Sequence, residues 1–250
     1  MSREIAAKET AAPLALSSIT KKLIADQGVE RSDALFAGQI DTSTKALASR
    51  TKVLGVGDKA PHFSLSTTKG GSWSLEDYLS RGEADSLVLV FYRGTWCAYC
   101  NVYMRQLIEV QSQLSDAKAT LIAVSPEAEP ISADDPVNVY MRDVLSAEAP
   151  RTEATSFLVL VDQDSKVADK YGLAFEMDDG AKATLRGIGL DLEKRNAGGG
   201  WTLPVPGTFV IDRFGKIAYA HVDADYRTGR IRKKSLQRAD RYRKPDCLTD

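Results

Sequence analysis

The stretch VLVFYRGTWCAYCN, residues 88–101, is the most informative part of this 250-residue chain for its fold. Its first half belongs to an apolar run, SLVLVFY at 86–92, of the kind that forms strands buried on both faces of a sheet. Its second half holds Cys97 and Cys100, and apolar residues recur at helical spacing after them. The stretch therefore predicts a buried strand that leads through a short loop into a helix, with two cysteines at the helix start.

This placement of the two cysteines suits redox chemistry. At a helix N-terminus Cys97 meets unpaired backbone N–H groups and the positive end of the helix dipole, which favour a thiolate and lower its pKa below ~8.5. Cys100 lies one turn further on, where Cβ atoms are ~5–6 Å apart, so a modest closing permits a disulfide. We expect one sulfur to be exposed and nucleophilic and the other to be more buried and to resolve the bond.

Two other interpretations of the pair are weaker. A zinc site needs two further ligands, and the candidates Cys247, His62 and His221 do not pair with one another at zinc-knuckle spacing. Two ordinary buried cysteines are also conceivable, but the preceding Trp96 and the step from strand to helix argue against that role. We therefore predict neither a metal nor a cofactor.

Composition excludes several classes of protein. The formal net charge of −1 favours neither a nucleic-acid nor a membrane partner. No uninterrupted apolar run approaches the ~20 residues that span a bilayer. The N-terminal apolar patch AAPLAL is too short for a secretory signal, and Glu4 and Glu9 argue against a mitochondrial presequence. We predict a cytoplasmic protein, in which thiols are kept reduced.

Three segments differ in character. Residues 1–50 predict helices that cap or dimerise the main body, residues 51–230 predict one domain, and residues 231–250 form a basic tail, which is more often solvated than bound to an acidic partner. Within the domain, alternating strands and helices followed by a hairpin predict an α/β fold with a mixed central sheet flanked by helices.

The expected elements follow from local patterns. Strands are expected near 63–65, after Gly70–Gly71, at 86–92, 119–125 and 156–162, and on both sides of a turn at 213–215. Helices are expected after the cysteines, near 137–146, and over SKVADKYGL with Ser165 as N-cap. Residues 175–203, with NAGGGW, predict an irregular segment with a flexible loop.

Pro206, in LPVPGTFVID, precedes a predicted buried strand. A proline is tolerated there because no ladder donor is needed. A cis peptide bond that exposes a backbone edge beside the cysteines is the other possibility. The residues alone leave both possibilities open.

These motifs together resemble a known family. WCAYC and VPGTFVID resemble the thioredoxin superfamily, in which Trp96, Cys97 and Cys100 match the redox motif and Pro206 matches the cis-proline position. VGDKAPHFSL, LVFYRGTWCAYCN, LIAVSPE, KVADKYGL and VPGTFVIDRFGKIAYAHVDADY occur in the order typical of the alkyl hydroperoxide reductase/thiol-specific antioxidant family. The resemblance runs from about residue 53 to 226, and a peroxiredoxin-like branch with FYRGxWCxYCN is most similar.

The resemblance implies a thioredoxin-like fold and a thiol peroxidase. Cys97 would attack the peroxide and form a sulfenic acid, and Cys100 would condense with it to a disulfide. Thioredoxin or glutathione/glutaredoxin would then reduce that disulfide. Thr95 and Arg93 would hydrogen-bond the peroxide and hold the thiolate, while Trp96 would shield the site.

The chain also departs from the family pattern, because its threonine stands two rather than three positions before the first cysteine. A distant arginine usually completes the peroxide pocket, and Arg186 is a candidate for it. Two alternatives remain. One is a general thiol–disulfide oxidoreductase that acts on protein disulfides, and the other is a non-catalytic binding module that keeps the fold.

Overall fold

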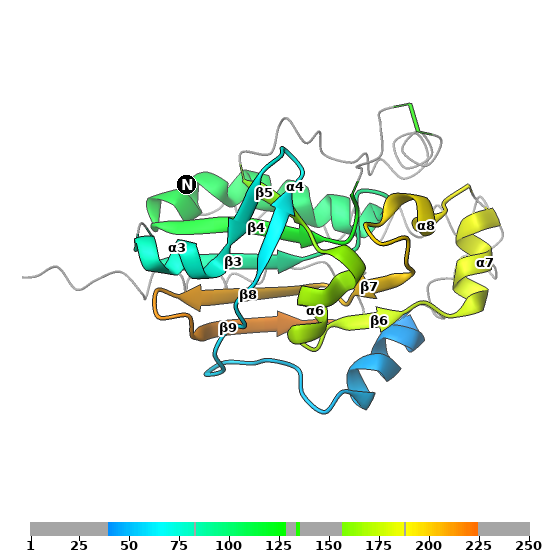
Figure 1. Ribbon diagram of the computed structural model, residues 1–250, viewed down its shortest axis with the longest axis horizontal. Helices are drawn as coiled ribbons and strands as arrows, with labels where there is room; N and C mark the ends of the chain where they lie inside the picture. Colours follow the sequence, from blue (N-terminus) through cyan, green and yellow to red (C-terminus); the bar gives the residue numbers. More distant parts are fainter. Residues whose placement is uncertain (1–39, 83, 129–133, 136–156, 188, 225–250) are drawn as a thin grey trace, which may run out of the picture.

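The structure is a computed structural model that describes residues 40–82, 84–128, 134–135, 157–187 and 189–224. Its centre is a seven-stranded sheet in the order β2-β1-β5-β4-β3-β8-β9 (Figure 1). The strands are β1 (Ser64–Thr67), β2 (Ser72–Ser74), β3 (Ser86–Phe91), β4 (Ala119–Ser125), β5 (Leu158–Val161), β8 (Gly207–Asp212) and β9 (Ile217–Val222). Each lies where the sequence predicts a strand.

The sheet is mixed. Strands β3, β4 and β5 run parallel, whereas β8 is antiparallel to β3 and β1 is antiparallel to β5. Strand β3 lies between β4 and β8 and is buried along its whole length, as its unbroken apolar run predicts. This arrangement confirms the predicted α/β, thioredoxin-like fold.

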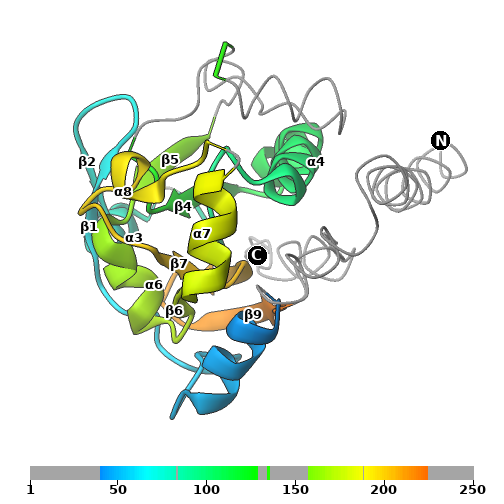
Figure 2. The same cartoon turned by 90° about the vertical axis from the view of Figure 1, so that its right-hand side faces the viewer.

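Two apolar layers lie on the two faces of the sheet because successive strand side chains point to opposite sides. On β3, Val88 and Val90 join the layer that holds Met104 and Leu107 of α4 (Ala98–Asp116). The intervening residues of β3 face the other layer, beneath α3 (Leu75–Arg81) and α6 (Lys166–Lys170). Figure 2 shows α4 on one side of the sheet and α3 and α6 on the other.

Helix α6 begins at Lys166, and Ser165 is its N-cap residue as predicted, but the side chain of Ser165 does not cap the helix. Its hydroxyl donates to the carbonyl of Thr202 instead, at 2.9 Å. The two oxygens of the Asp162 carboxylate accept the N–H groups of Val167 and Ala168, both at 2.8 Å. The backbone of Ser165 adopts a left-handed conformation (φ 53°), which turns its side chain away from the helix start.

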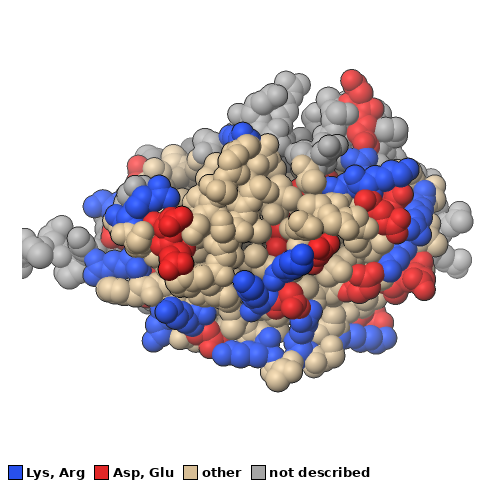
Figure 3. Space-filling view, in the orientation of Figure 1, with Lys and Arg blue, Asp and Glu red and all other residues tan. Residues whose placement is uncertain are grey.

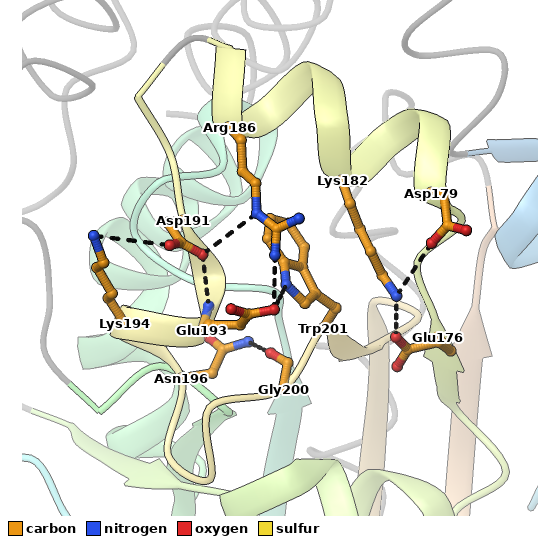
Figure 4. Close-up of polar contacts among 10 residues, drawn as sticks. All are labelled: Glu176, Asp179, Lys182, Arg186, Asp191, Glu193, Lys194, Asn196, Gly200 and Trp201. Carbon is orange, nitrogen blue, oxygen red and sulfur yellow. Dashed lines mark hydrogen bonds and ion pairs between the residues drawn. The ribbon is translucent and has the colours of Figure 1, made fainter.

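The prediction of an irregular segment at 175–203 is wrong. This part of the chain forms a two-stranded sheet and two helices: β6 (Ala174–Glu176), α7 (Asp179–Gly187), α8 (Leu192–Arg195) and β7 (Thr202–Pro204). The elements are short, and contacts outside each element hold them. Trp201 donates through Nε1 to Glu193 at 2.9 Å and lies beneath the guanidinium of Arg186, which pairs with the same carboxylate (Figure 4).

Residues 40–49 form a helix that packs on the main body (Figure 1). Leu47 contacts one core layer, and Thr42 donates to Asp178 at 2.8 Å. Most of the predicted extension, the predicted helix near 137–146, and the basic tail with Cys247 lie outside the described residues, so the three-part division of the chain stays a prediction.

Within the described ranges no helix is both long and apolar enough to cross a bilayer. Basic and acidic side chains are interspersed over the face seen in Figure 3.

Candidate active site

The loop between β3 and α4 is shaped by Gly94. Its φ of 146° is a conformation that side chains rarely adopt, and a Cβ there would lie 2.5 Å from Nε1 of Trp96. The N–H of Cys97 donates to the carbonyl of Gly94 at 3.2 Å and closes a tight turn. The turn places Cys97 directly before the first residue of α4.

Cys97 is the N-cap residue of α4, as the sequence predicts. Its Sγ accepts the backbone N–H of Cys100 at 3.3 Å, and Asn101 N–H donates to the Cys97 carbonyl at 3.0 Å in the first helical bond. The sulfur also accepts a hydrogen bond from Nη2 of Arg93 at 3.1 Å. A guanidinium and a helix N-terminus therefore converge on one sulfur.

These contacts give the two thiols different pKa values. Burial alone would raise the pKa of Cys97, but the hydrogen bond from the Cys100 thiol and the charge of Arg93 outweigh it and lower the pKa to about 6. Burial and the adjacent sulfur of Cys97 raise the pKa of Cys100. At neutral pH the pair is a thiolate at Cys97 beside a protonated thiol at Cys100, both free of a disulfide.

The expectation that one sulfur would be exposed is wrong. Cys97 is 2% exposed and Cys100 4% exposed. Both belong to the α4 side of the core, where Trp96 and Tyr99 also pack. Both sulfurs are therefore shielded from solvent in this conformation.

Thr95 is held by a residue that the sequence analysis did not single out. Its backbone N–H and its hydroxyl both donate to Oε2 of Glu127, at 2.7 Å and 2.8 Å. The amide of Asn101 donates to the Thr95 carbonyl at 2.7 Å. These bonds connect the loop before Cys97 both to α4 and to the chain after β4.

Glu127 reaches Thr95 because β3 and β4 are parallel neighbours that end at the same edge of the sheet. Phe91 pairs with Val124 in the ladder, and the chain after each strand continues past that edge. Burial raises the pKa of Glu127 to about 7, against the opposing effect of its two bonds from Thr95. The sequence feature that could have identified Glu127 is a carboxylate two residues after a buried strand, in LIAVSPE.

The other predicted site residues lie around this centre. Trp96 is 6% exposed and lies under the guanidinium of Arg93, 5.1 Å from it. Pro206 precedes β8, whose first residue, Gly207, pairs with Phe91 at the end of β3. Pro206 therefore lies at the sheet edge from which the cysteine loop departs. Its peptide bond is trans, so the cis form that the resemblance implies is not present.

Arg186 does not supply the site arginine. Its guanidinium stacks on Trp201, 4.9 Å from the ring centre, and pairs with Glu193 at 2.7 Å (Figure 4). Arg93 is the arginine that contacts the sulfur of Cys97. Among the described residues no group of three or more His, Cys, Asp or Glu side chains could hold a metal ion.

Comparison with known proteins agrees with this geometry. The profile of the AhpC/TSA family matches residues 56–220, most of the chain. The reduced 2-Cys peroxiredoxin of Plasmodium vivax is 15% identical with a TM-score of 0.50, and the match covers 74% of this chain and 80% of that one. A mutant of peroxiredoxin 6 from Arenicola marina is 17% identical with a TM-score of 0.50, covering 75% and 72%. Such identities establish a shared fold. No curated protein sequence matches the chain.

Proposed function

The chain belongs to the AhpC/TSA family, and on that premise we propose that it is a thiol-dependent peroxidase that reduces hydrogen peroxide or organic hydroperoxides through Cys97. The observation that carries the proposal is the sulfur of Cys97, which accepts hydrogen bonds from Arg93 and from the N–H of Cys100. These contacts maintain a nucleophilic thiolate near neutral pH. A metal or an organic cofactor is not required.

In the first step the thiolate attacks one oxygen of the peroxide. The S–O bond forms as the O–O bond breaks, so the sulfur is oxidised to sulfenic acid and the peroxide is reduced. The departing oxygen leaves as water or as an alcohol once it has taken up a proton. The guanidinium of Arg93 stabilises negative charge on the reacting oxygens, and Thr95 and Trp96 line the loop beside it.

In the second step Cys100 resolves the sulfenic acid. Its sulfur attacks Cys97, the S–O bond breaks, and the thiol proton leaves with the hydroxyl group as water. The raised pKa of Cys100 suits this order, because the residue keeps its proton while Cys97 reacts first. An external dithiol, thioredoxin or glutathione/glutaredoxin, then reduces the disulfide by exchange. This cycle suits a reducing compartment such as the cytoplasm.

A Cys100→Ser variant separates this function from a general thiol–disulfide oxidoreductase. The peroxidase should complete one fast turnover with hydrogen peroxide in stopped-flow fluorescence and accumulate a Cys97 sulfenic acid that dimedone labels. A disulfide oxidoreductase would instead trap mixed disulfides with protein substrates. A Cys97→Ser control should be inert toward peroxide. Equal peroxide consumption by that control and by the wild type would contradict the proposed function.

A further inference from the structure

Glu127 is a buried carboxyl whose environment satisfies only one of its two oxygens. The residue is 2% exposed, and Oε2 accepts both donors of Thr95. Oε1 is buried and has no hydrogen-bond partner among the described residues. An ionised carboxylate needs donors at both oxygens when it is removed from water, so this half-satisfied group favours its protonated form.

The carboxyl lies against the cysteine loop. A Cβ at Gly94 would lie 3.3 Å from the carboxyl carbon of Glu127, so a glycine three residues before Cys97 lets the acid approach the loop closely. Burial raises the pKa of Glu127 most, and the thiolate charge of Cys97 adds a smaller increase. The carboxyl is therefore bonded to Thr95 and coupled to the nucleophile.

We propose that Glu127 holds the proton that the departing oxygen of the peroxide receives, and that it delivers this proton through the hydroxyl of Thr95. Glu127 thus acts as a positioning and proton-holding residue for the proposed peroxidase, on which this inference rests. In the delivering state the hydrogen bond between the two residues is reversed. The protonated carboxyl donates to Oγ1 of Thr95, and the hydroxyl of Thr95 donates toward the peroxide.

The protons balance over a catalytic cycle. Thiolate, peroxide and protonated Glu127 give the sulfenic acid of Cys97, an alcohol or water, and the Glu127 carboxylate. Burial does most to raise the pKa of Glu127, and the thiolate charge adds to it; oxidation removes that charge, so the carboxyl ionises more easily at the moment when the proton is needed. After the disulfide is reduced, Cys97 returns as a thiol, and its ionisation restores the proton to Glu127.

Other charged groups around Glu127 set the pH range of this exchange. Arg195 of α8 lowers the pKa of the carboxyl, and Cys97 raises it. Tyr92, directly after β3, has its own pKa raised by burial and by the Glu127 charge and stays neutral. Arg93 is held by the sulfur of Cys97. The active form has Cys97 ionised and Glu127 protonated, so the peroxide rate should rise through about pH 6 and fall above about pH 7.

The test compares two peroxides whose departing oxygens differ in how strongly they need a proton. Hydrogen peroxide expels a strongly basic hydroxide, whereas peracetic acid expels the weakly basic acetate. We expect Glu127→Gln, which keeps an acceptor for Thr95, to lower the rate of Cys97 oxidation by hydrogen peroxide by roughly 10²-fold and to abolish the fall above neutral pH. With peracetic acid the rate should stay close to that of the wild type.

Matched variants complete the design. Glu109→Gln makes the same chemical change at an exposed position of α4 and should behave as the wild type. Thr95→Val should reproduce the selective loss with hydrogen peroxide, and Thr95→Ser should restore the rate. The valine variant also carries the test if Glu127→Gln does not fold.

The possible outcomes separate a failure of the inference about Glu127 from a failure of the proposed peroxidase function. A Glu127→Gln protein with the hydrogen peroxide rate and pH profile of the wild type would overturn the inference. An equal loss with both peroxides would also overturn it, because the carboxyl would then only support the loop. Wild-type protein that reacts with neither peroxide would overturn the proposed function itself.

Discussion

Nη2 of Arg93 lies 3.1 Å from Sγ of Cys97, and the two residues are four positions apart on either side of a glycine turn. Both side chains are 2% exposed, so their charges attract each other in a medium that screens poorly. The position of Arg93 two residues after β3 and that of Cys97 at the start of α4 bring the charges together.

Removal of the guanidinium should return Cys97 toward an ordinary thiol. In Arg93→Met we expect the pKa of Cys97 to rise toward ~8.5 and the peroxide rate at pH 7 to fall by roughly 10²-fold or more, because both the thiolate and the charge on the reacting oxygens lose a stabilising cation. Thiolate absorbance near 240 nm, followed against pH, measures the first effect. An unchanged Cys97 titration curve would contradict the role given to Arg93.

Arg186 provides the matched comparison. Because its guanidinium is held by Glu193 and Trp201, Arg186→Met should leave the peroxide rate and the Cys97 titration as in the wild type. The free energy of unfolding should fall by about 1 kcal/mol, since the variant loses a partly exposed ion pair and a cation–π contact. Stopped-flow rates and urea denaturation separate the two effects. A strong loss of peroxidase rate would show that Arg186 belongs to the pocket.

Gly94→Ala should damage the loop. The φ of 146° disfavours any side chain, and the added methyl would meet the indole of Trp96. We expect a loss of about 1–3 kcal/mol in unfolding free energy, measured by chemical denaturation, together with a higher pKa for Cys97 as the loop shifts. Gly187→Ala is a control, because its Cβ would enter open space at the end of α7. Equal stability of the two variants would show that the conformation of Gly94 is not needed.

Asp162, rather than Ser165, should control the start of α6. Asp162→Ala leaves two buried backbone N–H groups without their acceptor and should cost about 2 kcal/mol or more of unfolding free energy. Ser165→Ala removes one bond to the carbonyl of Thr202 and should cost about 1 kcal/mol. Denaturation curves for the two variants give the order. The reverse order would indicate that Ser165 caps the helix in solution.

The raised pKa of Glu127 should appear in the pH dependence of stability. An ordinary glutamate loses its proton near ~4.3, whereas Glu127 does so near pH 7 in the native state, so the native protein binds more protons between these values. The free energy of unfolding therefore falls as pH rises through this window, by at most about 1.4 kcal/mol for each pH unit. Cys97 acts in the opposite sense above pH 6, because its native pKa is lowered.

Glu127→Gln should remove the decline between about pH 4.5 and 7 and keep the rise above it. Urea denaturation at a series of pH values, with Glu109→Gln as the reference, measures the difference. A decline that persists in Glu127→Gln would assign it to another group.

Local sequence patterns were sufficient to predict the central sheet and the helix α4 that follows Cys97. The apolar run at 119–125 coincides with β4, because a strand buried on both faces needs no polar alternation. The position of Cys97 at the start of α4 follows equally from the strand-to-helix transition. The strands and helices that the sequence did not predict lie where contacts between residues distant in sequence decide the structure. Strands β6 and β7 have three residues each, and their pairing cannot be seen in either segment alone.

The site was predictable only in part for the same reason. Cys97, Arg93 and Thr95 belong to one contiguous stretch, so the sequence displays them together. Glu127 joins them because β3 and β4 are neighbours, and neighbouring strands cannot be identified from either strand by itself. The prediction that the Ser165 side chain caps α6 was wrong for a local reason. Serine is a favourable N-cap residue, but the left-handed backbone at Ser165 points its side chain away from the helix start.

One atom, the sulfur of Cys97, is both the proposed nucleophile and the acceptor of a hydrogen bond in the first turn of α4. Formation of the disulfide removes the negative charge of this sulfur and makes it a weaker acceptor, so the first turn of α4 should be held more firmly in the reduced protein than in the oxidised one. By thermodynamic linkage, the same preference makes the disulfide easier to reduce, so the fold itself helps to drive the return of the resting thiolate.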